Sequence, residues 1–149
     1  MATDNAAAHR APAASIARRL LSLVYETPLL VAVLLAGALP FLIFTRHLDP
    51  ALARALLQLY LLVLGGGYFV WQWRHGGQTL PMKTWRLRLV ARDGGPPSLR
   101  HCIYRYVLAL LGLALFGTGL FWALIDRDRQ FLHDRLAGTR IVTIGAERR

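Results

Sequence analysis

The chain has 149 residues, which fits one domain, and a net charge of +10, carried mostly by arginine. Hydrophobic residues make up 55% of the chain and are concentrated in long runs that are apolar on every side, which excludes an ordinary soluble fold. The arginines flank these runs without any nucleic-acid-binding motif, so the charge indicates membrane topology and not nucleic-acid binding. A single cysteine, Cys102, excludes an internal disulfide and a thiolate metal cluster.

The first hydrophobic segment comprises residues 20–44 and follows an alanine-rich stretch, residues 1–17, that predicts a disordered cytoplasmic tail. At about 1.5 Å per residue the segment is long enough to cross a hydrocarbon core of roughly 30 Å. Arg18 and Arg19 stand at its start. Basic residues beside a membrane span favour the cytoplasmic side, so we expect this end to be cytoplasmic.

A second hydrophobic segment, residues 51–73, follows a short external loop. The three consecutive glycines at residues 65–67 predict close packing against another helix. Tyr68, Trp71 and Trp73 near the far end predict an aromatic belt at the membrane surface. The two segments together predict a transmembrane hairpin.

Residues 74–100 form a polar stretch in which Asp93 is the single acid among many basic residues. That bias places the stretch in the cytoplasm, together with both ends of the hairpin. Residues 85–90 alternate apolar and basic side chains, which predicts a short strand, and residues 93–95 predict the turn that ends it. Residues 139–144 form a second alternating run, which could pair with the first strand if both lie on the same side of the membrane.

A third hydrophobic segment, residues 103–125, is interrupted by glycines and could either cross the membrane or enter it and return. The arginine-rich tail that follows favours a cytoplasmic C-terminus and therefore the returning arrangement. We predict an all-α membrane protein with a two-helix transmembrane hairpin, a third broken or re-entrant segment, and a small cytoplasmic cap with short β segments. Residues 18–144 form this membrane domain, and residues 145–149 are a C-terminal tail.

Several motifs in the chain resemble the RDD family of bacterial membrane proteins over residues 15–143. They are Arg18-Arg19-Leu20-Leu21 before the first segment, Gly77-Gln78-Thr79-Leu80-Pro81-Met82 after the second, and His133-Asp134 followed by Gly138-Thr139 near the end. The resemblance implies a multi-pass protein of the bacterial cytoplasmic (inner) membrane, without a defined activity. It also implies that Gly77, Gln78, Thr79, His133, Asp134, Gly138 and Thr139 are structural motif residues. The family arginine corresponds to Arg18 or Arg19 and the later aspartate to Asp134, whereas Glu26 stands where the family has an aspartate in the first helix.

Glu26 is the most informative residue of the first segment. It lies about 10 Å beyond Arg19 along a helix axis, within the hydrocarbon, where a carboxylate has to face protein and be compensated. Arg18, Arg19, Ser22 and Glu26 form a polar stripe that is a candidate ion or proton site. The alternative is a structural ion pair, with Arg54, Arg105 or another arginine as the partner of Glu26.

His133 and Asp134 can be interpreted either as acid–base or metal chemistry or as a structural cap. One histidine beside one aspartate does not make a zinc site, so no metal is expected and the cap is favoured. Asp134 could pair with Arg86, Arg88 or Arg105. Arg100 and Arg105 are candidates for binding lipid headgroups, or they only signal topology.

The functional hypothesis is a transport component that translocates ions or protons by means of Glu26. The alternative is a non-catalytic structural or assembly factor that binds a partner protein or anionic lipid through its basic cytoplasmic face. No enzyme motif and no cofactor motif is present in the sequence, so we do not expect an enzyme. The expected partners are the lipid bilayer, particularly its anionic lipids, and a second copy of the chain or another membrane protein, because so few spans rarely transport alone.

Overall fold

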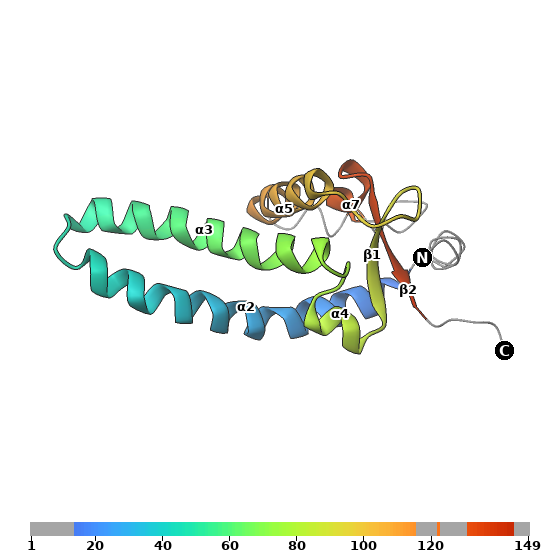
Figure 1. The fold of residues 1–149 in the computed structure, drawn as a ribbon, viewed down its shortest axis with the longest axis horizontal. Coiled ribbons are helices and arrows are strands. Elements are labelled where there is room, and N and C mark those ends of the chain that lie inside the picture. The colour runs from blue at the N-terminus through green and yellow to red at the C-terminus, as the bar shows by residue number, and fades with distance from the viewer. Residues whose placement is uncertain (1–13, 116–121, 123–130, 145–149) are drawn as a thin grey trace.

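The computed structural model describes residues 14–115, Trp122 and residues 131–144. Two long helices, α2 (Ile16–Thr45) and α3 (Pro50–Arg74), run antiparallel as a hairpin (Figure 1). Both are long and apolar enough to cross a membrane, with mean hydropathies of 2.4 and 1.4. The short connection ends at Asp49, whose carboxylate accepts hydrogen bonds from the backbone N–H groups of Ala51 and Leu52 at 2.9 and 3.1 Å. Pro50 then fits the first turn of α3, because its missing N–H would have no helical partner there.

The outer surface of the hairpin is apolar. Side chains such as Val24, Leu35 and Val63 are 66%, 62% and 66% exposed. A helix pair in water would bury such large apolar side chains. Between the helices, the rings of Phe41 and Tyr60 stack with their centroids 4.8 Å apart. Lipid is the solvent that matches this surface.

Helix α5 (Leu99–Ala114) packs on α3 at the glycine run. The hydroxyl of Tyr106 donates to the carbonyl of Leu62 at 2.8 Å, and its ring passes close to the backbone of Gly65 and Gly66. A methyl group on Gly66 would lie 3.0 Å from the Tyr106 ring, so the expected close packing is present there, while Gly67 faces open space. Whether the third hydrophobic segment crosses or re-enters depends on residues 116–121 and 123–130, which lie outside the described residues.

A small cap closes the end of the hairpin where α2 begins and α3 ends. It contains α4 (Leu80–Thr84), β1 (Leu87–Ala91), α7 (Leu132–Leu136) and β2 (Thr139–Thr143) (Figure 1). The strands pair antiparallel, with Leu87 opposite Thr143 and Ala91 opposite Thr139, which confirms the predicted pairing. The predicted strand boundaries are shifted, because Trp85 and Arg86 belong to the turn after α4, where Arg86 has a φ of +53°.

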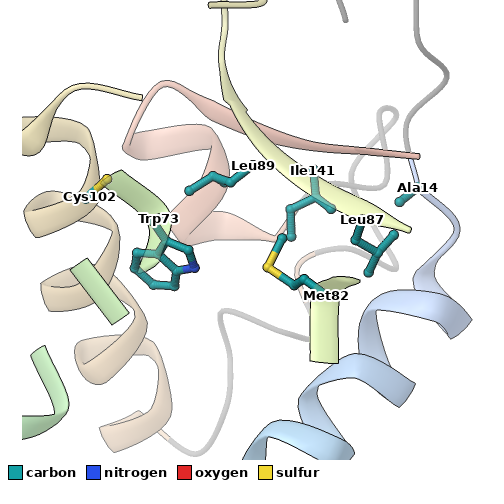
Figure 2. Packing of buried hydrophobic residues seen from close by; sticks show 7 residues of the cluster. All are labelled: Ala14, Trp73, Met82, Leu87, Leu89, Cys102 and Ile141. Carbon is teal, nitrogen blue, oxygen red and sulfur yellow. The ribbon is translucent and has the colours of Figure 1, made fainter. Parts of the chain in front are cut away.

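The buried core lies under this sheet and not between the two long helices. It consists of Ala14, Trp73, Met82, Leu87, Leu89, Cys102 and Ile141 (Figure 2). Ala14 belongs to it because its backbone N–H donates to the carbonyl of Ile141 at 3.1 Å. The predicted tail of residues 1–17 therefore extends too far, since Ser15 caps a helix that starts at Ile16.

The aromatic residues near the end of α3 do not form the belt predicted from the sequence. Trp71 is 64% exposed, as a belt residue should be. Trp73 is buried in the core, and Tyr68 points toward α2, where its hydroxyl binds Glu26. The prediction is therefore wrong for two of the three residues, because successive helical positions turn by about 100° and only one of the three faces outward.

Candidate functional site

Glu26 is buried, with 5% of its surface exposed, and hydroxyl groups from two other elements bind its carboxylate. The hydroxyl of Tyr68, on α3, donates to Oε1 at 2.6 Å. The hydroxyl of Thr79, at the start of α4, donates to Oε2. The carboxylate therefore connects α2, α3 and the cap, and each of its oxygens has a hydroxyl partner.

The Gly77-Gln78-Thr79 motif explains how Thr79 reaches Glu26. Gly77 has a φ of +68°, and a Cβ there would lie 2.6 Å from the carbonyl oxygen of Leu89, so glycine is required for both reasons. The N–H of Leu89 donates to the carbonyl of Gly77, and the side-chain amide of Gln78 donates to the carbonyl of Leu87, both at 2.6 Å. The motif thus attaches the loop to β1, and Thr79 caps α4 while it binds the carboxylate.

The polar stripe on α2 contains Arg19, Ser22 and Glu26, all of which are buried. Their spacing of three and four residues places them on one helix face. Arg18 was predicted to belong to this stripe, but it is exposed. It lies one residue before Arg19 and is therefore rotated by about 100° around the helix, so of the two arginines only Arg19 lies in the site.

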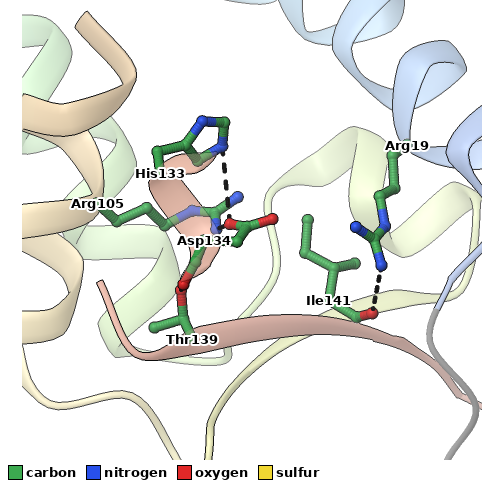
Figure 3. A network of polar contacts seen from close by, with 6 residues as sticks. All are labelled: Arg19, Arg105, His133, Asp134, Thr139 and Ile141. Carbon is green, nitrogen blue, oxygen red and sulfur yellow. Dashed lines mark hydrogen bonds and ion pairs between the residues drawn. The ribbon is translucent and has the colours of Figure 1, made fainter. Parts of the chain in front are cut away.

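Arg19 reaches from α2 to the end of the chain. Its Nη2 donates to the carbonyl of Ile141 at 3.3 Å (Figure 3). Its guanidinium lies 5.7 Å from the centre of the Phe131 ring. Among the described residues no arginine forms a salt bridge with Glu26, which corrects the expected structural ion pair. Arg54 is exposed on α3, and Arg105 pairs with a different carboxylate.

That carboxylate belongs to Asp134, which is fully buried and forms an ion pair with the buried Arg105. In Figure 3 the two side chains point toward each other, with His133 beside them at 3.7 Å from the carboxylate. The Arg105 guanidinium also lies 4.8 Å from the centre of the Trp73 ring. Arg105 is therefore a structural residue and not a lipid-binding one, whereas Arg100 is exposed. The other arginines predicted as partners of Asp134, Arg86 and Arg88, form no salt bridge with it.

The rest of the second motif shapes the chain around Asp134. Gly138 has a φ of +65°, which lets the chain leave α7 at Leu136 and enter β2 at Thr139, after two residues. The hydroxyl of Thr139 donates to the backbone carbonyl of Asp134 at 3.4 Å. The residues of this motif thus connect α7 to β2 and, through Asp134, to α5.

His133 is held neutral. Its pKa is lowered from 6.5 to about 3, mainly by burial and to a smaller extent by the positive charges of Arg105 and Arg19. A neutral imidazole can bind a metal, but no group of three histidine, cysteine or acidic residues lies together in the described ranges.

A cavity of about 50 Å³ lies beside these groups, between the hairpin and the cap. Its apolar wall includes Phe69, Trp73 and Met82. Its polar wall consists of Arg19, Ser22, Glu26, Thr79, Arg105 and His133. A space of this size and polarity accommodates a few water molecules, since one water needs about 10–15 Å³ on this measure.

Sequence reasoning missed Tyr68 as a site residue, because it was assigned to the membrane surface. A signal was available: Tyr68 is separated from Trp71 by three residues and from Trp73 by five, so the three cannot all face one way on a helix. Thr79 was recognised as a motif residue, but its contact with Glu26 depends on the fold of the loop.

Comparison with known proteins agrees with this arrangement. The model of the RDD family matches residues 13–138, which is most of the chain. A curated relative, the uncharacterized protein RP437 of Rickettsia prowazekii (strain Madrid E), is 34% identical over 76 residues, which cover 50% of this chain and 42% of that protein. The match thus spans less than half the length of the relative. No solved structure matches the chain. With the family motifs placed around one buried site and two long apolar helices beside it, the chain belongs to the RDD family of membrane proteins.

Proposed function

We propose that this protein is a multi-pass component of the bacterial cytoplasmic membrane that translocates protons or ions, with Glu26 as the binding group. The observation that carries the proposal is the pair of hydroxyl groups on the Glu26 carboxylate. A carboxylate on a membrane-crossing helix is costly and is commonly found at ion pathways and proton relays.

The chemistry of hydroxyl groups supports a group that changes its protonation state. A hydroxyl can donate and accept, whereas an arginine only donates. When Glu26 is ionised, Tyr68 and Thr79 donate to it, as observed. When Glu26 takes up a proton, it can donate to either hydroxyl after a rotation of one O–H bond. The site therefore keeps its hydrogen bonds in both states, which an ion pair with arginine would not allow.

The neighbouring cavity supports access to Glu26 from the cap side. It contains polar groups and has room for water, so protons can reach the carboxylate without a large movement of the helices. A cavity this small has no room for a bulky substrate. Most exposed side chains of α2 and α3 are apolar, so a complete pathway across the membrane would be formed with a second copy of the chain or another membrane protein.

Reconstitution into liposomes, with flux assays for protons and monovalent cations, tests this proposal. Glu26→Gln should leave membrane abundance near normal and abolish flux, and Glu26→Asp should keep part of it, because aspartate is the family residue at that position. Thr79→Val should reduce flux and Thr79→Ser should restore it, since serine keeps the hydroxyl. Asp93→Asn, at an exposed turn away from the site, is the charge-matched control and should behave like wild type.

The same variants separate transport from the rival role as a structural or assembly factor. In that role Glu26 only holds α2 to the cap, so Glu26→Gln would lower abundance or stability. Equal flux in wild type and Glu26→Gln at equal abundance would remove Glu26 from any transport mechanism and favour the structural role.

A further inference from the structure

At the cap end, each of the three long helices carries an exposed arginine close to an exposed aromatic residue. On α2, Arg18 precedes Tyr25 by seven residues, which returns to nearly the same face, and Tyr25 is 58% exposed. On α3, Trp71 is 64% exposed and lies one turn before the exposed Arg74. In both helices the aromatic residue lies farther from the cap than the arginine does, toward the apolar part of the hairpin.

Helix α5 repeats this arrangement most clearly. Arg100, Tyr104, Val107 and Leu111 are all exposed and are separated by four, three and four residues, so they form one stripe along the helix. From the cap toward the other end, the stripe changes from basic to aromatic to aliphatic. Because α5 runs antiparallel to α3, its first turn and the last turn of α3 lie at the same level (Figure 1).

This order of side chains matches the order of chemical groups in a phospholipid. Aliphatic side chains contact acyl chains, tyrosine and tryptophan lie at the level of the headgroups, and arginine binds phosphate through its planar guanidinium. Within the described residues, none of Arg18, Arg74 and Arg100 forms a salt bridge, so their guanidinium groups face outward without a carboxylate. The buried arginines of α2 and α5 differ from these three, because Arg19 binds the carbonyl of Ile141 and Arg105 pairs with Asp134.

We propose that Arg18, Arg74 and Arg100, here called the basic ring, bind the phosphate groups of anionic phospholipids in the leaflet on the cap side. Trp71 and Tyr104 lie against the glycerol region of the same lipids, and Tyr25, two turns beyond Arg18, lies deeper, against the acyl chains. The ring is a binding site on the outside of the protein and is separate from Glu26. It depends on the proposed membrane orientation of the hairpin but not on any flux, so the two proposals can fail independently.

The test is lipid selectivity of the full chain reconstituted in phosphatidylcholine membranes, measured by electron spin resonance with spin-labelled phosphatidylglycerol and spin-labelled phosphatidylcholine. Wild type should prefer the anionic lipid, with an upper bound of about fivefold for each arginine that meets a phosphate. The triple variant Arg18→Gln, Arg74→Gln, Arg100→Gln should lower the ratio toward one. High salt should lower the wild-type ratio as well, because surface charges are screened.

Arg92→Gln is the matched control, because Arg92 is also exposed and basic but follows β1 in the cap and belongs to none of the three long helices. It should leave the selectivity unchanged. Equal association of both lipids with wild type, or a triple variant that keeps the wild-type preference, would overturn the proposal. The proposal would also fail if Arg92→Gln lowered the lipid selectivity as much as Arg18→Gln, Arg74→Gln or Arg100→Gln does alone. That result would show a general effect of charge. Circular dichroism and flux of each variant verify that the fold and the Glu26 site are intact.

Discussion

Arg105 and Asp134 form an ion pair that joins α5 to α7, and both side chains are almost completely removed from solvent. The pair is surrounded by Trp73 on one side and His133 on the other. Taking two charges out of water is costly, so each one depends on the other. The ion pair therefore helps to hold α7, and with it the entry into β2, against α5.

Removing one charge of this pair should be far more harmful than removing both. Asp134→Asn leaves a buried guanidinium without its carboxylate, so we expect a loss of about 3–5 kcal/mol in unfolding free energy. The double variant Arg105→Met, Asp134→Leu should recover most of it, because no buried charge remains. Thermal unfolding in detergent, followed by circular dichroism, gives the measurement. If Asp134→Asn melted at the wild-type temperature, the ion pair would not be holding the cap.

The stability of the folded protein should depend on pH through His133. Its pKa is about 3 in the folded protein and about 6.5 when unfolded, so between these values the unfolded chain binds more protons. The free energy of unfolding that depends on a neutral His133 is therefore fully present above pH 6.5 and decreases as the pH falls toward 3. The midpoint of thermal unfolding, measured across this range, should fall less steeply in His133→Gln than in wild type. Parallel curves for the two proteins would show that the imidazole does not titrate as described.

Strand pairing makes a prediction about topology. Since β2 pairs with β1, the end of β2 has to lie on the same side of the membrane as the loop after α3. Reporters inserted at Gly94 and fused after Ile144 should therefore both report the cytoplasm, by the excess of arginine around them. A reporter at His47, in the connection between α2 and α3, should report the opposite side. A periplasmic signal after Ile144 with a cytoplasmic one at Gly94 would contradict the sheet itself.

Local patterns were sufficient to predict the two long helices and the two strands of this fold. The length of the apolar runs predicted α2 and α3, and the alternation of residues 85–90 and 139–144 predicted two strands that do pair. These features depend on neighbours in sequence, since periodicity and apolar length are local properties. The prediction that Glu26 must be compensated inside the protein was also confirmed, because burying a carboxylate is costly in any fold.

The identity of the partners could not be predicted in the same way. Arg105 was named both as a lipid-binding residue beside Arg100 and as one of three possible partners of Asp134, and only the fold selects the Asp134 pairing, because five residues of helix turn it away from Arg100. Tyr68 was assigned to the membrane surface, yet the rotation of α3 against α2 directs its hydroxyl to Glu26. Such rotations are set by contacts between elements far apart in the chain, as when Tyr106 packs against Gly66. These helix rotations cannot be read directly from a single sequence.

The contacts of α2 also have a consequence for the order in which the protein is made. Arg19 and Glu26 leave the ribosome early, but their described partners come later: Tyr68 and Thr79 from the middle of the chain, Ile141 from near its end. The first helix must therefore enter the membrane with two polar groups that are not yet satisfied by these contacts. The contact of Arg19 with Ile141 can form only after β2 has been synthesised and has paired with β1. The pairing of β2 is therefore a late step of biogenesis and also the step that completes the site.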